Sequence, residues 1–85
     1  MRRVSVRFNL GENRRYDSFF RRLHCLGAFP VMNSEWWLPT PFSLEELEME
    51  LRALIDPADR LLVTFVGAVS SRNLINRDRV STNSA

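Results

Sequence analysis

Arginine is the residue type with the clearest chemical potential in this 85-residue chain, because it supplies all twelve basic side chains. Seven of the twelve lie among residues 1–26, where the net charge is +5, whereas residues 27–66 carry −5 and the remainder +2. A guanidinium group is a planar fork of N–H donors that matches phosphate oxygens. Six arginines from an expected strand and helix therefore predict a basic surface for a phosphate backbone: Arg3, Arg7, Arg14, Arg15, Arg21 and Arg22.

Two other interpretations of these arginines remain open. They could form a solvated helix face, although such faces usually mix charges of both signs, as Glu48 and Arg52 do in a later segment. Arg3 and Arg7 could instead pair with acidic residues of a second subunit.

Other reactive side chains lack the partners that catalysis or metal binding would need. His24 and Cys25 are neighbours without a metal-ligand partner at useful spacing, and a single histidine cannot build a Ser/His/Asp arrangement. Gly11, Gly27 and Gly67 stand alone, so no glycine-rich phosphate loop is present. We therefore predict no cofactor and no resident metal.

Trp36 and Trp37 have two interpretations. Exposed rings stack on the bases of single strands. More often such a pair places one ring in the core and one in an interface, which is the interpretation we favour.

Hydrophobic periodicity predicts the elements that position these residues. Residues 4–9 and 60–66 read as strands, 16–26 as a helix ending at Gly27, and 28–32 with 35–38 as a hairpin. Ser43 and Glu46 form a capping box that starts a second helix, which Pro57 ends. Pro39 and Pro41 are expected to stop the preceding strand. The order β-α-β-β-α-β predicts an α+β, ferredoxin-like domain with a four-stranded antiparallel sheet and two helices on one face.

A second copy of the chain is expected to cover the other face of that sheet. Residues 60–66 are apolar on both faces, and two helices cover only one, so an isologous homodimer is predicted. We assign the contact to Trp36, Leu62, Thr64 and Val66. The domain spans residues 1–66, and residues 67–85 form a polar tail that is flexible or docks on the partner.

Several short motifs carry a resemblance to a known family: residues 8–10 (Phe-Asn-Leu), 26–28 (Leu-Gly-Ala), 34–36 (Ser-Glu-Trp) and 59–63 (Asp-Arg-Leu-Leu-Val), with a helix opening at Tyr16. Over residues 4–66 the chain resembles the CRISPR-associated protein 2-like superfamily, which includes virulence-associated protein D relatives and uncharacterised bacterial members. The resemblance implies a ferredoxin-like dimer.

The resemblance also implies a metal-binding aspartate at the end of the first strand, where this chain has Asn9. A neutral amide is a poor substitute for the carboxylate that Mg²⁺ favours, and Glu12 or Asp17 would have to replace it. Two interpretations of Asn9 stay open: a residual contact to metal or phosphate, and a turn-forming residue that ends the strand.

These observations predict a non-catalytic, dimeric nucleic-acid-binding or scaffold protein. By resemblance, it would hold duplex DNA or RNA and bridge copies of an integrase subunit. One alternative is an endoribonuclease or endodeoxyribonuclease that depends on Mg²⁺; another is a protein-interaction subunit that binds no nucleic acid. With one cysteine and no apolar run long enough for a membrane span, we expect a reducing, cytoplasmic setting and no membrane partner.

Overall fold

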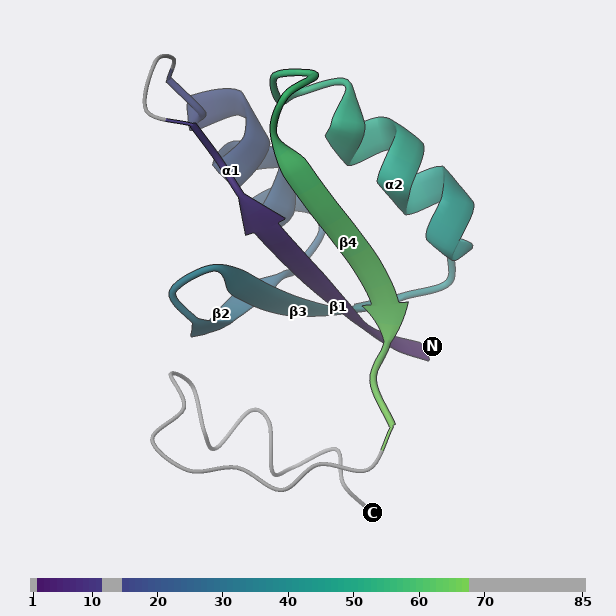
Figure 1. The fold of residues 1–85 in the computed structure, drawn as a ribbon. Helices are drawn as coiled ribbons and strands as arrows, with labels where there is room; N and C mark the ends of the chain where they lie inside the picture. The colour runs from purple at the N-terminus through teal and green to yellow at the C-terminus, as the bar shows by residue number, and fades with distance from the viewer. Residues whose placement is uncertain (1, 12–14, 68–85) are drawn as a thin grey trace.

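A four-stranded antiparallel sheet with two helices on one face forms the protein (Figure 1). The computed structural model describes residues 2–11 and 15–67. The elements are β1 (Arg2–Asn9), α1 (Asp17–Cys25), β2 (Phe29–Met32), β3 (Glu35–Thr40), α2 (Leu44–Arg52) and β4 (Arg60–Phe65). The strand order β2-β3-β1-β4 is compatible with a ferredoxin-like fold, so the predicted fold class is confirmed. Of the predicted tail, all but Gly67 lies outside the described residues.

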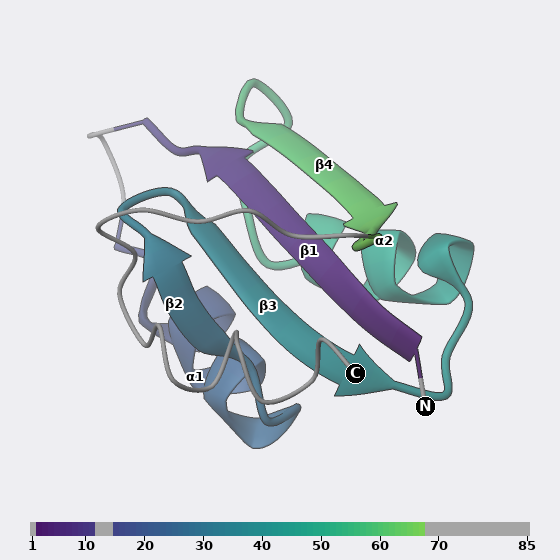
Figure 2. The ribbon, with the colours of Figure 1, turned by 90° about the horizontal axis from the view of Figure 1, so that it is seen from below.

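The alternating side chains of β1 show which residues lie on each face of the sheet. Val4 and Val6 are fully buried beneath the helices, and the alternate residues point to the other side, which Figure 2 shows unobstructed by α1 or α2. The pairing registers extend this division to the neighbouring strands. We call the second side the helix-free face; its strand residues include Arg3, Ser5, Arg7, Asn9, Glu35, Trp37, Arg60, Leu62 and Thr64, with Val66 just beyond β4.

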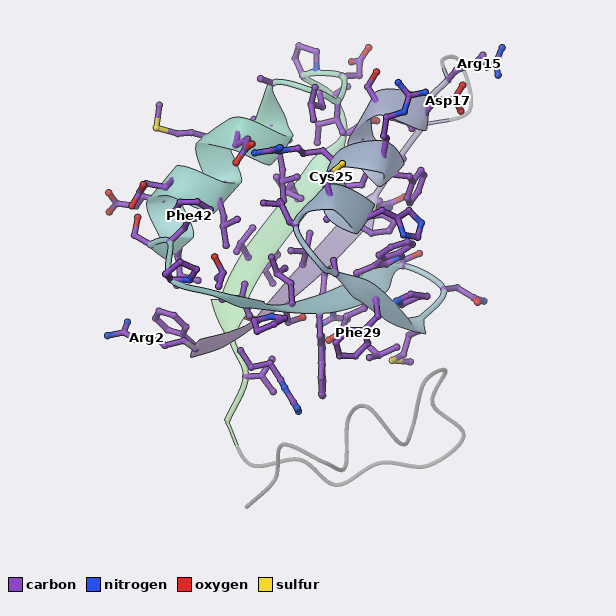
Figure 3. All side chains as sticks on the ribbon, turned by 180° about the vertical axis from the view of Figure 1, so that it is seen from behind. Arg2, Arg15, Asp17, Cys25, Phe29 and Phe42 are labelled. Atoms are coloured by element: carbon purple, nitrogen blue, oxygen red, sulfur yellow. The ribbon has the colours of Figure 1, made fainter. Side chains whose placement is uncertain are left out.

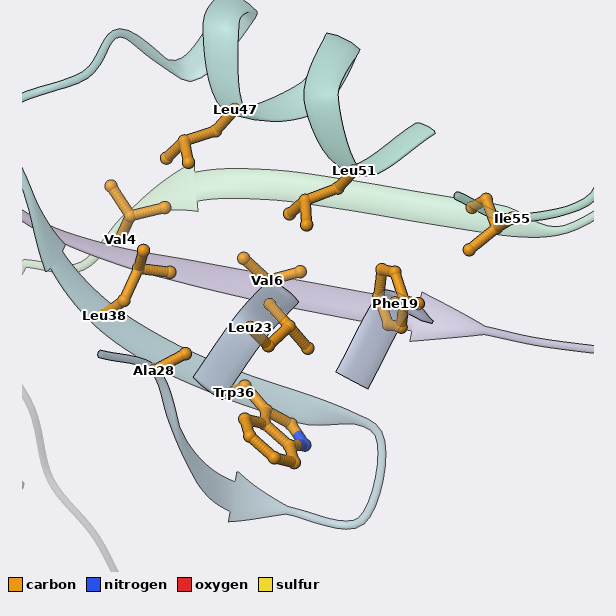
Figure 4. Close-up of a cluster of buried hydrophobic side chains, with 10 residues drawn as sticks. All are labelled: Val4, Val6, Phe19, Leu23, Ala28, Trp36, Leu38, Leu47, Leu51 and Ile55. Carbon is orange, nitrogen blue, oxygen red and sulfur yellow. The ribbon is translucent and has the colours of Figure 1, made fainter. Parts of the chain in front are cut away.

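The main core lies between the sheet and both helices (Figure 4). Helix α1 contributes Phe19 and Leu23, and α2 contributes Leu47 and Leu51, all four fully buried. These side chains pack against apolar residues of the strands and connections: Val4, Val6, Ala28, Trp36, Leu38 and Ile55. The helical spacing of the apolar residues in each helix therefore serves one shared core.

Local sequence signals define the helix ends. Gly27 has a φ of 83°, the left-handed conformation that ends a helix at low cost for glycine, directly after the C-cap residue of α1. The predicted capping box is present at α2: the Glu46 amide donates to Ser43 Oγ at 3.1 Å, and the Ser43 amide donates to Glu46 Oε1 at 3.3 Å. Helix α2 ends at Arg52, before Pro57, and the Arg52 guanidinium donates to the carbonyl of Asp59 at 2.7 Å.

Strand β3 continues through Pro39, which corrects the expectation that this residue stops it. Pro39 is opposite Arg3 of β1, and the carbonyl of Arg3 accepts from the amide of Val66, on the β4 side. This pair therefore exchanges no hydrogen bonds across β1 and β3. The missing N–H of proline costs nothing there, because the β2 pairing begins only at Trp37.

Among the described residues, no helix has the length and apolar character that crossing a membrane would require.

Candidate nucleic-acid interface

The sheet separates the predicted arginines into two groups. Arg3 and Arg7 belong to the helix-free face of β1, whereas Arg15, Arg21 and Arg22 lie just before or on α1, on the other side. Figure 3 shows Arg15 and Asp17 at the start of α1 and Phe29 on the opposite side of the sheet. Arg14 lies outside the described residues. A strand and a helix that are adjacent in the chain thus do not present their arginines on one flat surface.

Ion pairs occupy part of the helix-side group. Arg15 Nη2 lies 2.9 Å from Asp17 Oδ2, and Arg22 pairs with Glu50, which links α1 to α2. Arg21 is exposed and forms no ion pair with a described residue. The excess of positive charge on this side is therefore smaller than the sequence suggests.

On the helix-free face, Glu35 is the single acidic side chain among the described strand residues. Its Oε2 accepts from Ser5 Oγ at 2.7 Å and from Trp37 Nε1 at 2.8 Å. Its Oε1 lies 3.7 Å from Arg7 Nε, and the Glu35 side chain is only 18% exposed. The carboxylate is thus engaged by three side chains, and the guanidinium of Arg3 lies over the Trp37 ring at 5.3 Å.

A hollow of about 650 Å³ lies where the helix-free face meets the β2–β3 turn. Its charged and polar lining includes Arg7, Asn9 and Arg60 from the strands. The remaining lining residues are Phe8, Met32, Asn33, Ser34, Glu35, Leu61 and Leu62. Two arginines from neighbouring strands therefore line one depression.

Cross-strand register brings Arg60 to this site. Asn9 is directly opposite Arg60, and Arg7 is opposite Leu62. Arg7 and Arg60 are therefore diagonal neighbours, with backbones about 7–8 Å apart. Sequence reasoning did not include Arg60 among the binding arginines, because only the register between β1 and β4 reveals that it lies beside Asn9.

The acid next to Arg60 in the chain is occupied by structural hydrogen bonds. Asp59, 7% exposed, accepts at Oδ1 from the Gly11 amide at 2.8 Å. Its Oδ2 accepts from Tyr16 Oη at 2.5 Å and from the Asp56 amide at 2.9 Å. The hydrogen bond to Asp59, with smaller contributions from burial and from the negative charge, raises the pKa of Tyr16 above its usual value. Asp59, directly before β4, thus joins the loop after β1 to the N-cap of α1.

A carboxylate-held metal has little support around Asn9. In the part of the chain that the structure describes, no group of three His, Cys, Asp or Glu side chains is placed to hold a metal ion. Of the acids that would have to replace the missing aspartate, Asp17 pairs with Arg15 and Glu12 lies outside the described residues.

The two tryptophans lie on opposite faces of the sheet. Trp36 is 9% exposed in the main core, where the His24 ring contacts it edge-on at 5.0 Å. Trp37 joins Phe29 and Val31 in a smaller cluster on the helix-free face. Trp36 therefore does not lie on the same face as Leu62, Thr64 and Val66. The register places Trp37 on their face instead.

Comparison with known proteins found no family model, no curated protein and no solved structure that matches this chain. The fold therefore rests on the structure itself. The resemblance to the CRISPR-associated protein 2-like superfamily rests on the short motifs quoted above and stays a prediction.

Proposed function

We propose that this protein binds nucleic acid without cleaving it, through phosphate contacts made by the helix-free face, and that it works as a homodimer. One observation carries the proposal: Arg7 and Arg60 line one hollow whose single acid, Glu35, is already engaged by three side chains. Arg60 makes no ion pair with a described residue, and the Arg7 side chain is 63% exposed beside Glu35, so both guanidinium groups can bind an anionic ligand.

Phosphate contact is favoured over base recognition because neither tryptophan ring is available to stack on a base. Trp36 and Trp37 are 9% and 7% exposed, so neither offers a ring face to a base. Single-strand binders that stack bases need such exposed rings. Contacts to phosphate position a protein on nucleic acid without reading its sequence, so we expect weak sequence preference.

Dimerisation through the helix-free side of β4 accounts for its exposed apolar residues. Leu62 is 53% exposed and shares this side with Thr64 and Val66. An isologous contact would cover this patch in both copies. Leu62 also lines the arginine hollow, so two hollows would lie beside one contact and one nucleic acid would meet both. A scaffold role between integrase subunits and a reducing, cytoplasmic setting stay predictions.

Cleavage is the weaker alternative because it needs a carboxylate-held metal to activate water. Asn9 offers a neutral amide, and both oxygens of Asp59 already accept hydrogen bonds. We therefore expect neither RNA nor duplex DNA to be cut when Mg²⁺ is added.

Fluorescence anisotropy of labelled duplex DNA and structured RNA, measured at several salt concentrations in Mg²⁺, tests the proposal. The logarithm of the affinity should fall linearly with the logarithm of salt concentration, and Arg7→Gln and Arg60→Gln should each reduce the slope by about 1. Arg21→Gln, on the exposed side of α1, is the matched control and should change the slope little.

Three results would contradict this proposal. Absence of binding at low salt would leave a protein-interaction subunit as the better explanation. An equal effect of Arg21→Gln would move the site to the helix side. Magnesium-dependent cleavage on a gel would restore the nuclease alternative.

A further inference from the structure

We propose that the hollow lined by Arg7 and Arg60 binds the terminal phosphate of a nucleic-acid strand, so that the protein prefers phosphorylated strand ends. This inference rests on the proposed function and adds a substrate class to it. An internal phosphate can bind anywhere along a basic surface. A hollow lined by two arginines favours the terminal phosphate of a strand, which can enter it.

Charge favours a phosphomonoester over a phosphodiester. A terminal monoester carries about −1.5 to −2 charges at pH 7 and three free oxygens, whereas an internal diester carries one charge. Arg60 is exposed and makes no ion pair or side-chain hydrogen bond with a described residue. Arg7, its diagonal neighbour, supplies the second guanidinium. The two guanidinium groups exceed the single carboxylate of Glu35, so the hollow keeps a net positive charge that attracts a dianion more strongly than a monoanion.

Arg7 is partly oriented before any ligand arrives. Glu35 approaches it through Nε at 3.7 Å, and the Arg7 side chain remains 63% exposed. The other oxygen of Glu35 is held by Ser5 Oγ and Trp37 Nε1. The carboxylate thus has a fixed position, and a partly oriented guanidinium loses less freedom when it binds a phosphate.

The rest of the lining suits the nucleotide that bears the phosphate. Asn9, Asn33 and Ser34 offer neutral polar groups, and Met32, 53% exposed, offers apolar surface for the sugar and base. The volume of about 650 Å³ is more than one phosphate fills and falls in the usual range for small-ligand sites. A single terminal nucleotide fits that size, and a duplex does not.

The test compares single strands of one sequence that differ only at their ends. Strands with a 5′-phosphate or a 3′-phosphate are titrated by anisotropy against the same strands with hydroxyl ends, each labelled at the opposite end. We expect strands with one kind of phosphorylated end to bind about tenfold more tightly than strands with hydroxyl ends, because charge-assisted hydrogen bonds contribute that much. A nucleoside monophosphate phosphorylated at the same position should compete.

Variants locate the effect in the hollow. Arg60→Gln and Arg7→Gln should each remove the preference for a phosphorylated end while strands with hydroxyl ends still bind. Arg60→Lys should keep part of it, because the charge remains and the bidentate fork is lost. Arg21→Gln should keep all of it. Circular dichroism of each variant checks that the fold is intact.

The outcomes separate this inference from the proposed function. Equal binding of phosphorylated and hydroxyl ends would overturn the terminal-phosphate site and leave backbone binding standing. No binding of any strand would overturn both. A nucleoside monophosphate that binds when phosphorylated strands do not would overturn the assignment to strand ends.

Discussion

Replacing Asp59 by alanine removes one carboxylate that holds three segments of the chain together. Its oxygens accept from the Gly11 amide, the Tyr16 hydroxyl and the Asp56 amide at 2.8, 2.5 and 2.9 Å. These donors come from the loop after β1, the N-cap of α1 and the turn before β4. Few other contacts could replace them, because Asp59 is 7% exposed and long stretches of sequence separate it from Gly11 and Tyr16.

The expected loss of stability is large for a chain of this size. A hydrogen bond to a charged group contributes about 1.5–3 kcal/mol, but water can replace part of each bond at a partly buried site, so we expect about 3–5 kcal/mol for Asp59→Ala. With about 4–8 °C per kcal/mol for a small domain, the melting temperature should fall by at least about 12 °C. Asp59→Asn keeps one acceptor oxygen and should cost about 2–3 kcal/mol.

Urea denaturation followed by tryptophan fluorescence measures these differences, since Trp36 and Trp37 are both buried in the folded state. Asp17→Ala is the matched control: it removes a surface ion pair with Arg15 and should cost less than about 1 kcal/mol. An Asp59→Ala variant within about 0.5 kcal/mol of the wild type would refute the view that this carboxylate organises the three segments.

Three further predictions follow from individual contacts. Wild type should exceed Tyr16→Phe in stability below pH 10, and the difference should shrink as pH rises above 10 through the raised pKa of Tyr16, which pH-dependent urea titrations would show. Ser43→Ala should cost about 1 kcal/mol at every pH in the same assay, because it removes only a helix cap. Light scattering should give the mass of the proposed dimer for wild type and for Met49→Glu on α2, and the mass of a monomer for Leu62→Glu; the same mass for wild type and Leu62→Glu would count against the proposed contact.

Features set by neighbouring residues were predictable from sequence. Ser43 and Glu46 are three residues apart, so one turn of helix brings them together wherever the helix lies. Gly27 ends α1 for a similarly local reason, its φ of 83°. The alternation in β1 and the helical spacing in α1 and α2 then leave few ways to build one core, which is why the fold class could be predicted.

Features set by pairing between distant strands were not predictable. Adjacent tryptophans must point to opposite faces, but only the match of Trp36 to Val6 determines which ring enters the main core. The same kind of register places Arg60 beside Asn9. Arg7 and Arg21 are separated because α1 packs on the face of β1 that Val4 and Val6 occupy, which is a contact between elements and not a local feature of either.

Strand alternation links the stabilising cluster to the candidate site. Asp59 and Arg60 are adjacent, and at the start of β4 they point in different directions: Asp59 towards Tyr16 and Gly11, Arg60 towards Asn9 and the hollow. The charge of Asp59 is offset by its own donors and does not pair with Arg60. The carboxylate therefore has two relations to the site: it ties the start of β4 to Gly11, two residues after β1, and it forms no ion pair with the neighbouring Arg60. If this coupling holds, variants that loosen Asp59 should weaken phosphate binding even though Asp59 does not line the hollow.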